Sequence, residues 1–333
     1  MAPVTPSTHT LPNTQVEQRL EQHRRELTGY CYRMLGSSFE AEDAVQETMV
    51  RAWKGVERLE AREALRSWLY RIATNVCLDM LQSAKRRAQP MDLAEPQTAD
   101  ALLGAPLPET TWIQPMPDAR VLPDTGDPAE LAASRETLRL AFVAALQHLP
   151  PKQRAVLILR EVLRWQASEV AELLDTTTVS VNSALQRARA TIDQIAPQED
   201  GPAQVDEAEQ QELLARYVEL FERYDIEELV KLLAHDANFT MPPFDLWLRG
   251  PEQAKRWMLG PGIACKDAKV FTRWANGCPA MASYKPDEDG VFRPWAVAVL
   301  EVEDGRITSV LNFLGDRLFP VFDLPESLPP DAS

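Results

Sequence analysis

The stretch "LPPKQRAVLILREVLRWQASEVAELLDTTTVSVNSALQRAR", residues 149–189, determines the fold expected for the middle of the chain. Residues 167–174 carry apolar side chains at helical spacing, "DTTT" interrupts the pattern, and Thr177 can cap a helix that begins at about Thr178. The apolar stripe of this second helix consists of Val181, Ala184, Leu185 and Ala188. The pattern predicts a helix-turn-helix, whose second helix can enter a DNA major groove. An ordinary helical hairpin with a polar outer face gives the same pattern.

The charge of the whole chain argues against DNA binding, because its 333 residues carry a formal net charge of −15. That charge is unevenly distributed. Residues 19–90 hold 13 Lys/Arg against 10 Asp/Glu, and residues 136–195 hold 7 against 6. Residues 91–135 hold 2 against 8, and residues 196–333 hold 13 against 25. The acidity therefore lies outside the two segments that are candidates for nucleic-acid binding.

Composition shifts divide the chain into segments. Residues 1–15 are rich in Pro, Thr and Ser and are expected to be disordered. Helical periodicity covers 16–90, where Ser37 and Glu40 form a candidate capping box, and it returns over 135–196. Eight prolines within residues 88–134 mark 91–134 as an acidic linker. Residues 205–320 alternate helices with strands, with a hairpin turn at "VEDGRI" (302–307), and 321–333 form a tail.

Several classes of function are disfavoured. No segment has the length of apolar sequence that spans a bilayer, and the N-terminus lacks a signal-peptide pattern, so a cytoplasmic protein without membrane contact is expected. The cysteines form no CxxC pair and have no partner at zinc spacing. They are Cys31, Cys77, Cys265 and Cys278. We therefore expect buried thiols, no bound metal and no cofactor.

Two motifs give the chain a family resemblance. "SFEAEDAVQETMVRAW" (38–53) followed by "LRSWLYRIATNVCLDMLQSAKRR" (65–87) resembles the first half of the extracytoplasmic-function (ECF) sigma factors of the sigma-70 family, and residues 149–189 resemble the second half. "WIQPMPD" (112–118) and "FTMPPFDLWLRG" (239–250) resemble the subgroup with a fused C-terminal SnoaL-like domain. The resemblance implies two all-α sigma modules joined by an irregular linker, followed by an α+β SnoaL/NTF2-like cone domain. It also implies promoter-specific transcription initiation, with no enzymatic activity.

The family's first module binds core RNA polymerase, through its beta and beta-prime subunits. The matching positions here are Asp43, Gln46, Glu47 and Arg51, most of which share one helix face. A solvated charged face is the alternative interpretation, and the contact is favoured for Asp43, Gln46 and Glu47. Trp53 also matches the motif, and it either joins this contact or packs in the core.

The resemblance assigns recognition of the −10 promoter element to the third helix, expected over about 62–87. Trp68, Asn75 and Asp79 lie at the border of its buried stripe, where they either hydrogen-bond internally or hold an unstacked base. The structural interpretation is favoured for Trp68. The candidates for phosphate contact are Arg66, Arg71, Lys85, Arg86 and Arg87. The last three could instead stabilise the C-terminus of the helix through its dipole.

The resemblance assigns recognition of the −35 promoter element to the helix-turn-helix. Its candidate DNA-binding residues are Thr178, Val179, Asn182, Ser183, Gln186 and Arg187. In the family the two elements lie about 16–17 base pairs apart, roughly 55–60 Å at 3.4 Å per pair. About 45 linker residues, each spanning up to about 3.3 Å, exceed that distance. The linker either threads a basic polymerase channel, with "WIQPMPD" as its anchor, or is a solubilising spacer.

The C-terminal segment predicts strands near 237–241, 246–249, 269–274, 280–284, 295–303 and 306–314. A pocket in the cone could be lined by Trp247, Trp257, Trp274, Trp295, Phe239, Met241 and Phe313, although most are expected in the core. His235, Asp236, Asp245 and Asp316 are weak candidates for catalysis, because no acid/base pair stands out. A regulatory domain that contacts the sigma modules or the polymerase is favoured. A stand-alone helix-turn-helix regulator, and a sensor or enzyme for a small apolar ligand, are the alternatives.

Overall fold

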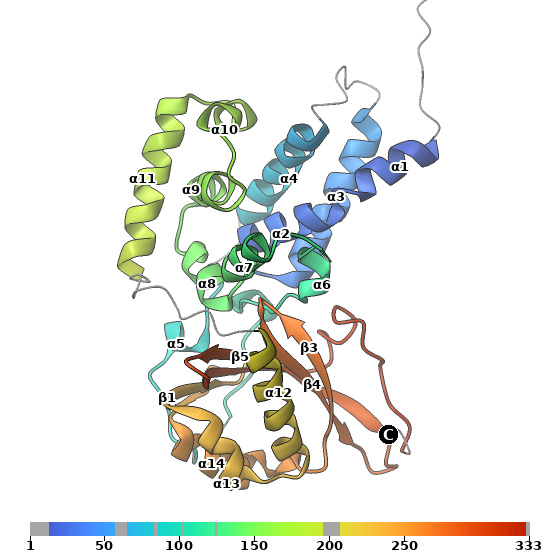
Figure 1. The fold of residues 1–333 in the computed structure, drawn as a ribbon, viewed down its shortest axis with the longest axis vertical. Helices are drawn as coiled ribbons and strands as arrows, with labels where there is room; N and C mark the ends of the chain where they lie inside the picture. The colour runs from blue at the N-terminus through green and yellow to red at the C-terminus, as the bar shows by residue number, and fades with distance from the viewer. Residues whose placement is uncertain are drawn as a thin grey trace, which may run out of the picture.

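The computed structural model describes residues 13–56, 65–82, 86–101, 103–123, 125–195 and 207–330 (Figure 1). Two helical modules lie at one end of the molecule and an α+β domain lies at the other. Lys85 and most of the predicted N-terminal segment 1–15 lie outside the described residues. Among the helices that the structure describes, none combines the length and the apolar character needed to cross a membrane.

The first module consists of α1 (Asn13–Glu21), α2 (Arg24–Leu35), α3 (Ser38–Gly55) and α4 (Leu65–Leu81). The apolar stripe of α2 is fully buried, at Leu27, Tyr30, Cys31, Met34 and Leu35. Helix α3 begins where Ser37 Oγ accepts a hydrogen bond from the Glu40 amide at 3.2 Å. The Glu40 carboxylate pairs with Arg87, so the structure shows the Ser37 half of the predicted capping box.

The second module consists of α8 (Leu140–Gln147), α9 (Pro151–Leu157), a π-helical turn η4 (Ile158–Val162), α10 (Ala167–Leu173) and α11 (Thr178–Ile195). Helices α10 and α11 form the predicted helix-turn-helix. Thr177 Oγ1 accepts a hydrogen bond from the Ser180 amide at 3.1 Å, as expected of the residue that caps α11. Val170, Ala171 and Leu173 hold α10 against the module's core.

The linker between the modules is packed against its neighbours. It contains short elements only: α5 (Pro90–Leu93), η3 (Glu109–Thr111), α6 (Asp118–Val121) and α7 (Pro128–Glu136). Trp112, Ile113 and Met116 within "WIQPMPD" are buried. Its first half runs beside the α+β domain, where the Gln97 amide donates to the Trp247 carbonyl at 2.9 Å. Prolines explain why this segment forms no long helix, and burial explains how it remains ordered.

The C-terminal domain begins with α12 (Glu207–Glu222), α13 (Ile226–Leu229) and η5 (Val230–Leu232). Its six strands are β1 (Leu233–Thr240), β2 (Trp247–Arg249), β3 (Lys269–Ala275), β4 (Cys278–Pro286), β5 (Phe292–Glu303) and β6 (Arg306–Leu314), with α14 (Pro251–Leu259) and η6 (Pro261–Cys265) inserted after β2. The sheet order is β2-β1-β6-β5-β4-β3, in which only the β1–β6 pair is parallel. All six predicted strands are present, and Asp304 and Gly305 adopt the positive φ angles of the predicted hairpin turn.

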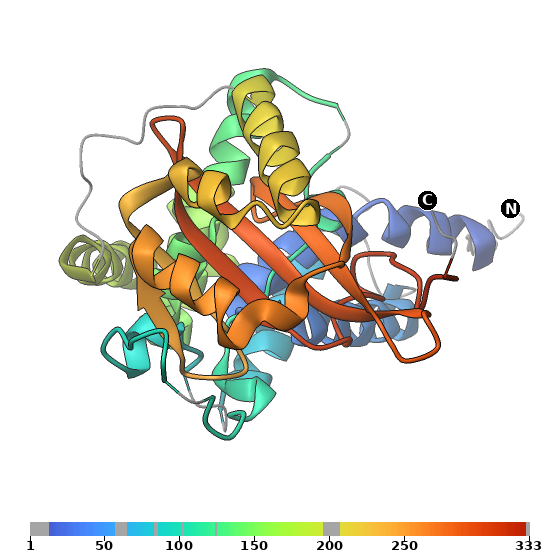
Figure 2. The ribbon, with the colours of Figure 1, turned by 90° about the horizontal axis from the view of Figure 1, so that it is seen from below.

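The two faces of the sheet bury different parts of the chain. One face packs against α12, α13 and α14, and Figure 2 shows helices of this domain lying over the sheet. The opposite face, with Tyr284, Val299 and Phe313, joins a continuous hydrophobic core that extends through both helical modules. The segment after β6 belongs to the same core, because Phe319 and Phe322 are buried there. The three parts of the chain therefore share one core.

Candidate nucleic-acid interface

Helix α11 presents the face predicted to contact DNA. Thr178, Val179, Asn182, Gln186 and Arg187 are exposed and Ser183 is half-buried, while Val181, Leu185 and Ala188 are buried on the opposite side. The Val179 side chain is 72% exposed. An exposed valine is unfavourable in water, and it suits contact with a thymine methyl group in a major groove. The face is thus open and contains both amide and apolar groups.

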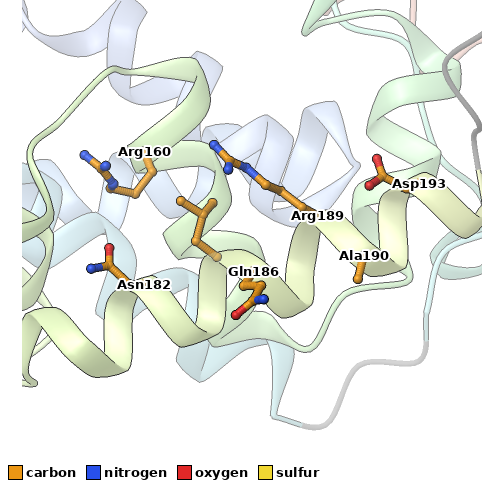
Figure 3. Close-up of a pocket in the computed structure, with 7 residues that line it drawn as sticks. Arg160, Asn182, Gln186, Arg189, Ala190 and Asp193 are labelled. Carbon is orange, nitrogen blue, oxygen red and sulfur yellow. The ribbon is translucent and has the colours of Figure 1, made fainter.

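A hollow of about 490 Å³ borders this face (Figure 3). It is lined by Arg160, Asn182, Leu185, Gln186, Arg189, Ala190 and Asp193. Both cations are already engaged: Arg160 donates to the Trp165 carbonyl, and Arg189 Nη2 lies 2.6 Å from Glu161 Oε1. With Glu161 and Asp193 alongside, the hollow has no net positive charge, so the free groups that it offers are the amides of Asn182 and Gln186.

The α3 face predicted to bind polymerase is also open. Its four predicted residues, Asp43, Gln46, Glu47 and Arg51, are all exposed. Val50 lies among them and is exposed as well. Trp53 is 37% exposed in a groove of about 260 Å³ between α1 and α3, so it is neither fully in the core nor free in solvent. Two apolar side chains ringed by charged groups have the layout of a protein-binding surface.

The residues predicted to hold a −10 base occupy different environments. Trp68 is half-buried against Gly55, which agrees with a structural role. Asn75 and Asp79 are exposed, and within the described residues the Asn75 side chain forms no hydrogen bond. Asn75 and Arg71 line one wall of a groove of about 790 Å³, and Arg187 of α11 lines the other. The structure therefore brings parts of the two predicted DNA-binding sets to one groove.

Two of the predicted phosphate-binding cations, Arg66 and Arg71 of α4, contact the second module. Arg66 Nε donates to Glu26 at 2.9 Å, and its guanidinium lies over the rings of Tyr70 and Trp165 at 5.3 and 5.5 Å. Tyr70 and Trp165 meet edge to face at 5.1 Å. Arg71 donates to the Glu172 carbonyl at 3.3 Å. These contacts tie α4 directly to the helix-turn-helix.

Arg86 and Arg87, the described cations that follow α4, are also engaged. Arg86 Nη1 donates to His148 Nε2 at 2.8 Å, and burial together with Arg86 lowers the pKa of His148, so the imidazole accepts as a neutral group. Arg87 is 6% exposed, pairs with Glu40 at 2.5 Å and donates to the Trp112 carbonyl at 2.8 Å. In this arrangement Arg87 is a structural residue that fixes the linker. Its phosphate contact stays a prediction that requires the linker to leave.

Comparison with known proteins identifies the family. Residues 20–87 match Sigma-70 region 2, residues 139–192 match Sigma-70 region 4, and residues 214–310 match a SnoaL-like domain. The ECF RNA polymerase sigma factor SigG of Mycobacterium tuberculosis is 44% identical over 311 residues, which cover 92% of this chain and 83% of SigG. The chain belongs to the ECF sigma factors.

The ECF sigma factor SigJ of Mycobacterium tuberculosis is 26% identical over 323 residues, covering 92% of this chain and 94% of SigJ. The crystal structure of SigJ matches with a TM-score of 0.60 at 22% identity, over 94% of this chain and 99% of that one. The likeness shows that the two helical sigma regions and the SnoaL-like domain form a shared fold.

In this sigma factor, the tip of the β3–β4 hairpin connects all the parts of the molecule. The fully buried Asn276 side chain accepts from the Met116 amide at 2.8 Å and donates to Tyr32 Oη at 2.7 Å and to the Leu138 carbonyl at 2.6 Å. These partners belong to the linker, to region 2 and to the entry of region 4. Beside Asn276, the Gly277 amide donates to Asp118 Oδ1 at 2.9 Å.

Sequence reasoning missed this junction and the Trp165 contact. Asn276-Gly277 is the strongest local signal for a hairpin turn, and its φ angles of 57° and 70° confirm such a turn. The dipeptide alone gives no indication that the tip is buried. Burial raises the pKa of Asp118 to about 6, which marks a carboxylate poorly compensated for its loss of water.

The predicted pocket-lining residues of the SnoaL-like domain do not lie around one common cavity. Phe239, Met241 and Trp257 lie in the core on one face of the sheet and Phe313 in the core on the other. Trp247 Nε1 donates to the Ala94 carbonyl, so the linker covers it, whereas Trp274 lies beside Arg135 and Trp295 beside Lys285. His235, Asp236 and Asp316 are exposed and Asp245 is half-buried. His235 Nδ1 lies 3.4 Å from Asp236 Oδ1, but both side chains are exposed to solvent and line no enclosed pocket within the part of the chain that the structure describes.

Proposed function

We propose that this chain is a promoter-specificity subunit: it binds core RNA polymerase through region 2 and places regions 2 and 4 on the −10 and −35 elements. The observation that carries the proposal is the pair of open faces on α3 and α11, each formed by the residues that the family motif marks. We assign the chain no covalent chemistry of its own. Its specificity comes from binding and strand separation.

Polymerase binding rests on α3. Asp43, Gln46 and Glu47 offer carboxylates and an amide, and Val50 and Trp53 supply the apolar centre that such an interface needs. The beta and beta-prime subunits are the proposed partners. The polymerase-binding face of α3 is exposed even though region 2, region 4 and the SnoaL-like domain are packed together. Polymerase can therefore bind α3 without prior rearrangement of the molecule.

DNA binding requires that the two sigma regions separate. Tyr70 of region 2 and Trp165 of region 4 are in van der Waals contact, whereas the two promoter elements are roughly 55–60 Å apart at 3.4 Å per base pair. One rigid body with α4 against the helix-turn-helix cannot reach both. Separation also frees Arg71 from Glu172 and Arg86 from His148, and it uncovers Arg66 by removing Trp165, so these side chains become more accessible to phosphates.

The SnoaL-like domain is proposed to regulate this separation. It shares a core with both regions, and its hairpin tip bonds to region 2, the linker and the entry of region 4. Removing these contacts favours the separated form. We therefore expect the domain to restrain DNA binding until polymerase engages region 2.

Transcription with purified components tests the proposed function. Full-length protein and core polymerase should yield promoter-specific run-off transcripts, and the Glu47→Lys variant should yield fewer. Duplex binding of the same affinity with and without polymerase would support a stand-alone regulator instead. Tight binding or turnover of an apolar small molecule without DNA would support the sensor or enzyme alternative. Failure to form a holoenzyme overturns the proposal.

A further inference from the structure

Asp118 lies where the SnoaL-like domain closes on the sigma regions. Its side chain is 8% exposed, at the start of α6 in the linker, and faces the β3–β4 hairpin tip. Within the described residues, the Gly277 amide is the single hydrogen-bond donor to its carboxylate, at 2.9 Å. One neutral donor compensates poorly for burial of a negative charge. The closed arrangement therefore favours the neutral acid.

We propose that this contact is a proton-sensitive latch: protonated Asp118 holds the hairpin tip and the linker together, and its ionisation loosens them. The proposal rests on the regulatory role proposed for the SnoaL-like domain and names the group through which that regulation responds to acidity. Loosening at the tip also releases Asn276 from the linker and both sigma regions, because Asn276 and Gly277 are adjacent.

The charged and titratable groups around Asp118 come from four elements. Arg135 of α7 favours the ionised form, but its Nη1 is already bound to Glu207 Oε2 of α12 at 2.7 Å, and that carboxylate opposes the effect. Tyr32 of α2 and Cys278 of β4 also face Asp118, and burial raises the pKa of each, so both are neutral. Burial outweighs the Gly277 hydrogen bond and Arg135, which gives Asp118 a pKa of about 6.

The sign of the pH effect follows from proton linkage. In an open form, Asp118 is exposed to water and its pKa returns towards the ordinary 3.8, so the closed form binds the proton more tightly. The closed form is therefore most stable, relative to the open form, in acid. This relative stability falls as pH rises through about 6 and changes little at higher pH. The pKa of Asp118 differs by about two units between the closed and the open form. This difference raises the ratio of open to closed form by about fourfold between pH 5.5 and 8.

A second, half-buried acid lies at the same interface. Glu301 of β5 lies beside Arg139 and the start of α8, and burial raises its pKa. Its protonation favours the closed form for the same reason. A variant of Asp118 alone is therefore expected to lose most, and not all, of the pH response.

Hydrogen exchange of the full-length protein, corrected for the intrinsic effect of pH, measures opening of the latch. The probes are the Met116 and Gly277 amides, bonded to Asn276 and Asp118. In the wild type, protection should fall about fourfold from pH 5.5 to 8. Asp118→Asn, which keeps the acceptor and loses the charge, should stay protected at pH 8. The exposed turn residue gives the control, Asp289→Asn, which should behave as wild type.

A flat wild-type profile, or an Asp118→Asn variant with the full pH response, overturns the latch. Gly277→Ala tests it from the other side and does not depend on the folding of the Asp118 variant. A Cβ at Gly277 would lie 2.8 Å from Arg135 Cβ, and φ is +70°, so protection should be low at every pH. Unchanged protection in Gly277→Ala would also refute the proposal. Run-off transcription at one pH reports separately on the sigma function, so the two proposals can fail independently.

Discussion

Region 2 presents two helices that differ in accessibility. On α3, the residues that match the polymerase-binding motif are exposed. On α4, Arg66 and Arg71 are bound by Trp165 and Glu172 of region 4, and beyond its end Arg86 is bound by His148. The difference implies an order of events, in which polymerase binds the open face first and DNA binds only after region 4 has moved.

The contacts that close α4 are unequal in strength. The Arg71–Glu172 pair is exposed, and pairs of this kind contribute at most about 1 kcal/mol. Trp165 is buried, and its ring packs against Tyr70 and under Arg66. Its indole N–H finds no partner among the described residues, which costs about 1–3 kcal/mol. The face of α4 is therefore covered mainly by Trp165, a large side chain whose indole N–H lacks a hydrogen-bond partner within the described residues.

The largest expected effect comes from Trp165→Ala. Deleting a buried tryptophan removes about 3–5 kcal/mol of packing, and here part of that packing joins the two sigma regions. Hydrogen exchange should accelerate over α4 and leave α3 unchanged. The matched control is Trp295→Ala, which removes a half-buried indole from β5, on the SnoaL-like domain. Equal acceleration of α3 and α4 would show that Trp165 stabilises region 2 generally and does not close one face.

Asn276→Ala should have the next largest effect. It leaves the Met116 amide and the Leu138 carbonyl without their partner in a buried site, at a cost of about 1–3 kcal/mol for each group left unsatisfied, whereas Tyr32 Oη keeps its hydrogen bond to the Gln114 carbonyl. The SnoaL-like domain should then separate at lower urea concentration than the wild type. Asn238→Ala is the control, because that side chain forms no hydrogen bond within the described residues. A single unshifted unfolding transition in Asn276→Ala would contradict the role of the junction.

The open face is tested by Glu47→Lys, which should weaken binding of core polymerase by about 10- to 100-fold, or about 1.4–2.8 kcal/mol. Glu219→Lys is a matched control, because both glutamates form exposed pairs with an arginine four residues later, at 2.7 Å for Glu47 and 3.1 Å for Glu219. Affinity measured by fluorescence anisotropy should fall only for Glu47→Lys. Equal losses in both variants would mean that general charge, and not α3, controls binding.

Local signals in the sequence predicted much of the fold. Ser37 and Thr177 cap their helices, and the Asp304-Gly305 turn joins β5 to β6, because each depends on residues within a few positions of one another. The alternation that predicted six strands is equally local. The open faces of α3 and α11 were predictable for the same reason, since helical periodicity separates the buried side from the exposed side.

The closure of the molecule was not predictable from local pattern. Asn276 and Tyr32 are 244 residues apart in the chain, and Arg87 meets the carbonyl of Trp112 across the linker. Lys85, Arg86 and Arg87 look alike as a basic run, yet Arg87 is buried against Glu40. Which cation of such a run is structural depends on a carboxylate distant in sequence, and periodicity carries no information about that.

The smallest expected effect separates two arginines of α11. Arg187 is exposed without an ion pair among the described residues, whereas Arg189 is paired with Glu161 at 2.6 Å. Arg187→Gln should therefore lower the salt dependence of holoenzyme binding to promoter DNA by about one unit of slope, because one phosphate contact is lost. Arg189→Gln should change the slope less, since its charge is already neutralised. Identical slopes for the two variants would show that DNA displaces Glu161 from Arg189, and the −35 contact would then extend along α11 to include Arg189.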